Sequence, residues 1–204
     1  GFMQDAGKEV ADATKALQAE HRLTGLILDL RGNPGGRLDE AVNVTNTFVP
    51  QNELIVEMRG RTPDSRNKFY TRRSPVDLEL PLTVLVNRRS ASASEIVSGS
   101  LQDLDRAIVI GERSFGKGLV QNVRPLTDNG QSQLKITIAK YYTPSGRCIQ
   151  AIDYAQRRQG YDGLTPDSLV QQFTTRSGRP VFDGAGIEPD ITIPHPRLQP
   201  VTQA

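Results

Sequence analysis

Leu82-Thr-Val-Leu-Val86, followed closely by Ser90-Ala-Ser-Ala-Ser-Glu-Ile96, decides the fold class of this chain. The first stretch is a short apolar run rich in β-branched residues, which is typical of a buried strand. The second stretch carries Ser92 and Glu95 at the spacing of a capping box, which predicts a helix from about Ser92 to Asp103. A strand that leads into a helix through a short loop is the building unit of an α/β protein.

The same alternation of strands and helices continues on both sides of this unit. Helices are predicted at residues 4–21, with Ala6, Val10, Ala13 and Leu17 on one stripe, and at 38–48, with Leu38, Ala41, Val42, Thr45 and Phe48 facing inward. Strands are predicted at 25–30 (buried and parallel), 54–58 paired with 68–71, 82–86, 107–110, 119–123, 134–138 (half-buried) and 191–193. The predicted fold class is therefore α/β, with a mixed β-sheet wrapped by helices.

The length of 204 residues fits a single domain that can bury a substantial core. Residues 153–186 are polar and rich in turns, so we interpret them as an insertion, with a short helix near 166–173. Pro194, Pro196 and Pro200 end regular structure in a tail at 194–204. Because the chain starts almost directly in a helical pattern, we expect it to be truncated at its N-terminus.

Composition excludes several classes of function. A net charge of +2 is too small to suggest nucleic acid as a partner. Cys148 is the only cysteine, so no internal disulfide can form, and its alternating neighbours indicate a packing thiol. No apolar run is long enough to cross a membrane. A local basic run is interpreted as the solvated face of a hairpin: Arg61, Arg66, Lys68, Arg72 and Arg73.

Two isolated histidines argue against both a zinc site and a Ser-His-Asp triad. His21 ends the first helix, where a cation suits the helix dipole, and His195 lies between two prolines. We therefore predict that the chemistry needs no metal and no cofactor.

Ser92 is a candidate nucleophile because it opens a helix. Free backbone N–H groups at a helix N-terminus can stabilise an oxyanion. The alternative is purely structural, since Ser92 and Glu95 also fit a capping box that satisfies only the helix itself. Ser90 and Ser94 are rival nucleophiles on sequence grounds.

The loop Asn33-Pro-Gly-Gly36 follows the carboxyl end of the predicted strand at 25–30. Ligands of open α/β sheets bind beyond that edge, and paired glycines allow backbone N–H groups to point into a cavity. The alternative is an ordinary turn from strand to helix.

Lys117 lies between Gly116 and Gly118, where its side chain can approach another backbone closely. A lysine in water has a pKa near 10.4, so a lysine base requires burial or a positive field that lowers its pKa. Gln121 falls on the same side of an extended strand and could hold the amine without adding charge. A serine paired with a neutral lysine can cleave amides. The alternative is an exposed lysine in a glycine turn.

A partial P-loop at Gly111–Lys117 offers a different interpretation. Its eighth position is Gly118 where Ser or Thr is needed, and the residues that follow are predicted as a strand instead of a helix. Nucleotide binding is therefore not favoured.

Taken together, these motifs resemble the C-terminal processing peptidases, also called tail-specific proteases. The matching segments cover about residues 8–152 and 184–193. They are Gly25-Leu-Ile-Leu-Asp-Leu-Arg-Gly-Asn-Pro-Gly-Gly36, Ser90-Ala-Ser-Ala-Ser-Glu-Ile96, Gly111-Glu-Arg-Ser-Phe-Gly-Lys-Gly118 with Gln121, Tyr141-Tyr-Thr-Pro-Ser-Gly-Arg147, and Gly186-Ile-Glu-Pro-Asp190. Five motifs in order are highly specific. The resemblance implies a ClpP/crotonase-like protease core.

The resemblance also implies roles for individual residues. Ser92 would be the nucleophile, Lys117 the base and Gln121 a support for the lysine. The oxyanion donors would be the N–H of Ala93 and that of Gly36, with Gly35 as the alternative. Glu95 matches as a supporting residue that braces the helix.

The expected activity is that of a serine endopeptidase that cleaves near the C-terminus of protein or peptide substrates with free tails. Members of the family usually carry a PDZ domain, which is absent from this sequence, and they work outside the cytoplasm, in the periplasm or cell envelope. A homo-oligomer is compatible with the resemblance. Two alternatives stay open: an inactive relative that acts as a binding or scaffold module, and a crotonase-like acyl-transfer enzyme with a coenzyme A substrate.

Overall fold

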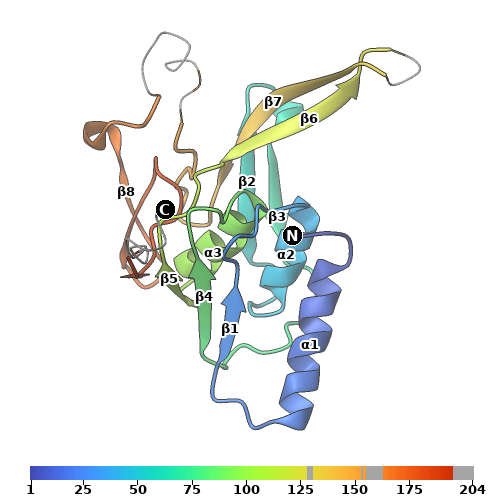
Figure 1. Cartoon of the computed structure of the whole chain (residues 1–204), viewed down its shortest axis with the longest axis vertical. Helices are drawn as coiled ribbons and strands as arrows, with labels where there is room; N and C mark the ends of the chain where they lie inside the picture. Colours follow the sequence, from blue (N-terminus) through green and yellow to red (C-terminus); the bar gives the residue numbers. More distant parts are fainter. Residues whose placement is uncertain (128–130, 153, 155–162, 195–204) are drawn as a thin grey trace, which may run out of the picture.

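The computed structural model describes residues 1–127, 131–152, 154 and 163–194, and it confirms the α/β fold class (Figure 1). The expected turn at 128–130, His195 and most of the tail lie outside the described residues. Within the described residues, no helix is both long and apolar enough to cross a membrane.

A parallel sheet forms one part of the molecule. It contains β1 (Leu26–Asp29), β4 (Leu82–Val86), β5 (Ile108–Gly111) and β10 (Ile191–Thr192), in the order β1-β4-β5-β10. All three pairings are parallel, and Leu28, Val84 and Val109 are neighbours across three strands. The expected parallel strand at 25–30 is therefore confirmed, and it forms an edge of the sheet.

An antiparallel sheet forms the second part. It contains β2 (Leu54–Gly60), β3 (Asn67–Tyr70), β6 (Leu119–Pro125) and β7 (Gln133–Tyr142), in the order β3-β2-β7-β6. The strands β2 and β3 are joined through the short 3₁₀ turn η1 (Pro63–Ser65). Parallel and antiparallel pairings are thus divided between two sheets, where the sequence suggested one mixed sheet.

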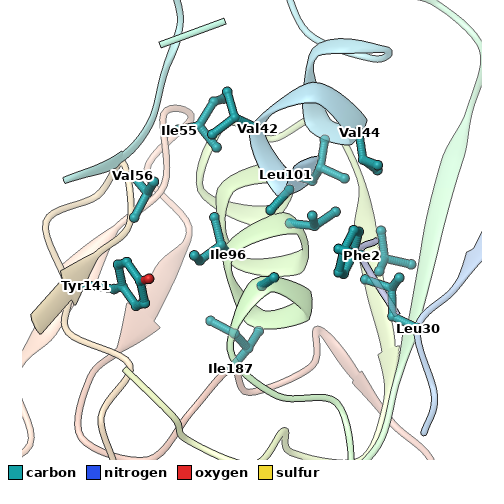
Figure 2. Close-up of a cluster of buried hydrophobic side chains, with 14 of the residues drawn as sticks. Phe2, Leu30, Val42, Val44, Ile55, Val56, Ile96, Leu101, Tyr141 and Ile187 are labelled. Carbon is teal, nitrogen blue, oxygen red and sulfur yellow. The ribbon is translucent and has the colours of Figure 1, made fainter. Parts of the chain in front are cut away.

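Helix α3 (Ala93–Asp103) contacts both sheets, through β2 of one and β5 of the other. Every residue of α3 is buried, and Figure 2 shows Ile96 and Leu101 with core side chains on both sides of the helix. Small residues make this burial possible. The hydroxyls of Ser98 and Ser100 donate to carbonyls one turn earlier, and a Cβ on Gly99 would lie 2.7 Å from Ile187.

Helix α1 (Ala6–Glu20) packs against α2 (Leu38–Asn46), and only the first half of the expected stripe, Ala6 and Val10, packs against the core. Gly7 and Thr14 are buried, whereas Ala13 and Leu17 are exposed. The physical reason is close approach: the N–H of Gly7 donates to the carboxylate of Glu40 at 2.8 Å, and a Cβ on Gly7 would collide with Asn43. The inward face predicted for 38–48 is confirmed.

Two predictions of burial were wrong. Ile27 in β1 is 66% exposed, because no described element covers the outer face of the parallel sheet. Leu134 and Ile136 in β7 are 44% and 43% exposed. They lie on a hairpin of β6 and β7, here called the β-arm, which projects away from the parallel sheet (Figure 1).

The described part of the predicted insertion forms the 3₁₀ turn η2 (Asp167–Leu169) and a hairpin of β8 (Gln172–Thr174) and β9 (Pro180–Phe182). This hairpin docks on the end of α3. The N–H of Arg176 donates to the carbonyl of Asp103, and Arg179 pairs with Asp105 at 2.7 Å.

A buried ion pair fixes the same end of α3. Arg147 and Asp103 are both fully buried, with the guanidinium and carboxylate 2.8 Å apart. Arg147 also donates to the side chain of Gln102 at 2.7 Å. The motif that ends at Arg147 therefore serves the core of the protein.

Replacing Arg147 with Ala should reduce the free energy of unfolding by about 3–5 kcal/mol, because Asp103 would stay buried without its partner. Urea denaturation measures this change. The matched control is Arg113→Ala, which removes a surface pair with Glu188 and should cost at most about 1 kcal/mol. Equal effects of the two substitutions would contradict a special role for the buried pair.

Candidate active site

The carboxylate of Glu95 joins the two segments that carry the predicted dyad. Glu95 is fully buried in the first turn of α3. Its Oε2 accepts the N–H of Ser92 and the N–H of Lys117, each at 2.8 Å. Its Oε1 accepts the hydroxyl of Ser114 and the N–H of Gly116, each at 2.6 Å. A single carboxylate oxygen thus holds the backbones of Ser92 and Lys117 together.

The backbone of Ser92 is strained. Ser92 precedes α3 with φ of 56° and ψ of −114°, outside the regions that non-glycine residues normally adopt. Such strain persists only where surrounding bonds impose it, and it concentrates at functional sites. The capping box with Glu95 is present, so the structural interpretation of this motif also holds. Ser92 is only partly buried.

The rival serines are committed to structure. The hydroxyl of Ser90 donates to the carbonyl of Leu30 at 2.7 Å, and Ser90 is fully buried. The hydroxyl of Ser94 donates to the carbonyl of Asn33 at 2.8 Å, and Ser94 is also fully buried. Ser92 is therefore the one serine of the three that a substrate could reach.

The glycine loop lies against Ser92. A Cβ on Gly35 would lie 2.8 Å from the nitrogen of Ala93 and 3.0 Å from the Cβ of Ser92, so only glycine fits. The N–H of Gly35 donates to the side chain of Asn33. The N–H groups of Gly36 and Ala93 have no acceptor among the described residues. Gly36 is exposed, whereas Ala93 is buried. Of Gly35 and Gly36, Gly36 is the one whose backbone N–H has no acceptor among the described residues.

The side chains of Lys117 and Gln121 are not joined to Ser92 or to each other by hydrogen bonds among the described residues. Lys117 is partly buried, and Gln121 lies four residues later on β6 with an exposed side chain. In the described part of the chain, no hydrogen bond links the Lys117 amine to Ser92 or to Gln121. The structure thus brings the backbones of Ser92 and Lys117 together and leaves the two reactive atoms without a direct bond.

Ser114 is a supporting residue that the sequence did not single out. Its hydroxyl donates to Glu95 and accepts the N–H of Ile187 at 2.7 Å. The segment that contains Gly186 therefore packs closely against the loop that carries Lys117. A Cβ on Gly186 would lie only 3.0 Å from the nitrogen of Gly116. The position of Ser114, three residues before Lys117 inside a recognised motif, was the available signal.

Burial shifts the pKa of two groups, the Glu95 carboxyl and the Cys148 thiol. Burial raises the pKa of the Glu95 carboxyl above its ordinary value, and the hydrogen bonds from Ser114 and three backbone N–H groups oppose the shift. Burial also raises the pKa of the Cys148 thiol, as expected for a packing thiol. Among the described residues, no cluster of three or more His, Cys, Asp or Glu side chains could hold a metal ion.

Comparison with known protein families identifies the family of this chain. The model of peptidase family S41 matches residues 1–170. The chain belongs to peptidase family S41. The carboxy-terminal-processing protease of Bartonella bacilliformis is 44% identical over 174 residues, which are 84% of this chain and 37% of that protein. The corresponding Synechocystis protein is 38% identical over 172 residues, which are 84% of this chain and 36% of that protein.

Solved structures support the same assignment. The photosystem II D1 C-terminal processing protease matches with a TM-score of 0.69 and 29% identity, covering 94% of this chain and 40% of that one. This S41 chain therefore spans less than half the length of each of these three relatives. The ClpP/crotonase-like interpretation of its sequence agrees with a fold shared by S41 proteases.

Replacing Glu95 with Gln should lower peptide cleavage strongly while it changes the free energy of unfolding only a little. The amide can no longer accept at both atoms, so two of the four donors lose their acceptor, and the Ser92 and Lys117 backbones should move apart. We expect peptide cleavage to fall about 100-fold, the usual cost of a displacement near 1 Å. The free energy of unfolding should change by less than about 2 kcal/mol, since the amide removes a desolvated charge.

The pH dependence provides a second readout for the same substitution. As pH rises above about 4.3, the Glu95 carboxyl loses its proton in the unfolded chain. In the native protein the same carboxyl keeps its proton to a higher pH, because its native pKa is raised. The stability of wild type should therefore fall relative to Glu95→Gln as pH rises through that window. A difference in stability that grows in favour of wild type would contradict the raised pKa.

Proposed function

We propose that this chain is the catalytic core of a serine endopeptidase that cleaves protein substrates near their C-terminus with a Ser92–Lys117 dyad. The observation that carries the proposal is the shared Glu95 carboxylate, whose Oε2 accepts the N–H of both residues. Membership of family S41 and the names of the relatives support the same activity.

In the proposed reaction, neutral Lys117 accepts the proton of the Ser92 hydroxyl as the oxygen attacks the scissile carbonyl carbon. The tetrahedral intermediate collapses, the C–N bond breaks, and the Lys117 ammonium gives its proton to the leaving amine. Water then loses a proton to Lys117 and attacks the acyl-enzyme ester. The ester bond breaks, the proton returns to Ser92, and the second product leaves as a carboxylic acid.

Two backbone donors would stabilise the oxyanion in both tetrahedral intermediates. The free N–H groups of Ala93 and Gly36 support this role, and each such donor contributes about 3 kcal/mol. Gly35 is less suited because its N–H already bonds to Asn33. The strained Ser92 backbone adds to this preorganisation.

The missing bond between the Ser92 hydroxyl and the Lys117 amine favours a second candidate, a non-catalytic binding module of the same fold. Catalytic hydrogen bonds are often loose in free enzymes and tighten when substrate binds, so the free geometry is compatible with activity. Gln121 would then hold the lysine after a rotation of its exposed side chain.

The substrates, location and assembly follow from the relatives by analogy. We propose protein or peptide substrates with free C-terminal tails, a location outside the cytoplasm in the periplasm or cell envelope, a homo-oligomer as a compatible assembly, and a PDZ domain as the companion of this core. Under this proposal neither a cofactor nor nucleic acid takes part.

The direct test is cleavage of an unstructured protein with an apolar C-terminal tail, with the products identified by mass spectrometry. Wild type should cleave, whereas Ser92→Ala and Lys117→Ala should be at least about 1,000-fold slower. Lys117→Arg should be equally inactive, because a guanidinium cannot give up its proton.

Three outcomes separate the candidates. Loss of activity in both alanine variants supports the dyad. Activity that survives in Lys117→Arg contradicts lysine as the base, and activity that survives in Ser92→Ala contradicts Ser92 as the nucleophile. Binding of the tail without cleavage by wild type favours the binding module.

A further inference from the structure

Gln150 is a buried amide that the proposed reaction does not use. It lies on the segment that follows β7, and it is only 8% exposed. Its Oε1 accepts the N–H of Gly118 at 2.8 Å, and its Nε2 donates to the carbonyl of Ile152 at 2.9 Å. Both ends of the amide are thus bonded to backbone groups, and one of these groups belongs to the residue next to Lys117.

Gln150 is the second of two side chains that hold the peptide groups around Lys117. The N–H groups of Gly116 and Lys117 donate to Glu95. The next N–H along the chain, that of Gly118, donates to Gln150. The two acceptors come from different parts of the fold, since Glu95 belongs to α3 and Gln150 follows β7. Three consecutive backbone donors are therefore fixed from two sides of the loop that carries Lys117.

The backbone of Gln150 also contacts this loop directly. The N–H of Ala151 donates to the carbonyl of Gly116 at 3.0 Å. A Cβ on Gly118 would lie 2.7 Å from the nitrogen of Gln150, so this close approach requires glycine. Because the two backbones are in contact, a change in the Gln150 side chain acts on the loop that carries Lys117 without an intervening element.

A purely structural role is the alternative for Gln150. A buried N–H needs an acceptor wherever it lies, and Gly118 is buried. Asn46 is a matched example of such a role. Its Oδ1 accepts the N–H groups of Arg72 and Arg73, and its Nδ2 donates to the carbonyl of Arg73. That loop carries none of the candidate site residues. The two amides make the same kinds of bond, and of the two only Gln150 holds the peptide that follows the proposed base.

We propose that Gln150 is a positioning residue for the Ser92–Lys117 dyad, which fixes the peptide after Lys117 through a neutral oxygen. The inference rests on the proposed function and deepens it. A displacement near 1 Å can reduce a reaction rate about 100-fold, so a base benefits from a backbone that is fixed on both sides. The neutrality of the acceptor matters as well, because a nearby carboxylate favours the ammonium form of a lysine, which cannot accept a proton.

The first test separates a positioning role from support of the fold. Gln150→Met removes the amide and keeps a side chain of similar length, and Asn46→Leu does the same at the matched amide. Cleavage of a fluorogenic peptide gives kcat and KM, and urea denaturation gives the stability of each variant. Gln150→Met should lower kcat about 10- to 100-fold and leave KM within about twofold of wild type, because it acts on the base and not on substrate binding. Asn46→Leu should lower stability without a comparable loss of kcat.

Gln150→Glu tests rescue by a conservative variant. Its carboxylate keeps an oxygen that can accept the N–H of Gly118, but it adds a negative charge near the lysine. We therefore expect most of the wild-type kcat to return at high pH. The midpoint of the rise in rate with pH should lie about one unit above that of wild type, since the added charge favours the ammonium form.

Three results would overturn the inference. They are a kcat of Gln150→Met equal to that of wild type, an equal loss of kcat in Asn46→Leu, and a Gln150→Glu variant that is as slow as Gln150→Met at every pH.

A second measurement does not depend on cleavage. An acylating reagent reacts with neutral amines, and peptide mapping by mass spectrometry follows the labelling of Lys117 as pH rises. Gln150→Glu should displace this labelling to higher pH by about one unit, whereas Asn46→Asp, which adds the same charge at the matched amide, should not. Displaced labelling in a protein that cleaves no peptide would retain the role of Gln150 and contradict the proposed function. Cleavage by wild type without displaced labelling in Gln150→Glu would retain the function and contradict the need for a neutral oxygen at this position.

Discussion

The carboxylate of Glu95 is the interaction on which the arrangement of the site depends. It accepts four hydrogen bonds while fully buried, and the donors come from the start of α3 and from the loop that carries Lys117. Burial of this charge is costly, and the four donors offset the cost only when both segments are in position. One of the four bonds comes from the N–H of Ser92, whose backbone conformation is strained.

Much of the fold could be predicted from the sequence because local signals were strong. The apolar runs of β1 and β4, the capping box before α3 and the inward face of α2 all appear in the structure. The division into two sheets could not be predicted, because strand pairing depends on partners distant in sequence. The exposed Leu134 and Ile136 show the same limit, since alternation reveals the two faces of a strand but not what covers them.

The sequence motifs were sufficient to propose the residues of the candidate site, but they did not predict the hydrogen bonds through which Glu95 links those residues. Ser92, Lys117 and the glycine loop could be found from motifs, and the exclusion of Ser90 and Ser94 required their hydrogen bonds. The role of Glu95 exceeds that of a brace for the helix, because it also accepts the N–H of Lys117 from 22 residues away. Ser114 and the buried Arg147 act through contacts that no local pattern encodes.

In the proposed dyad, Ser92 is a nucleophile that Lys117 activates. The most direct measurement is covalent labelling with a serine-reactive fluorophosphonate, read by intact mass and then by peptide mapping. We expect a single adduct on Ser92 in wild type and its loss in folded Lys117→Met, which keeps a side chain of similar length without the amine. Labelling at another serine, or equal labelling rates in wild type and Lys117→Met, would contradict it.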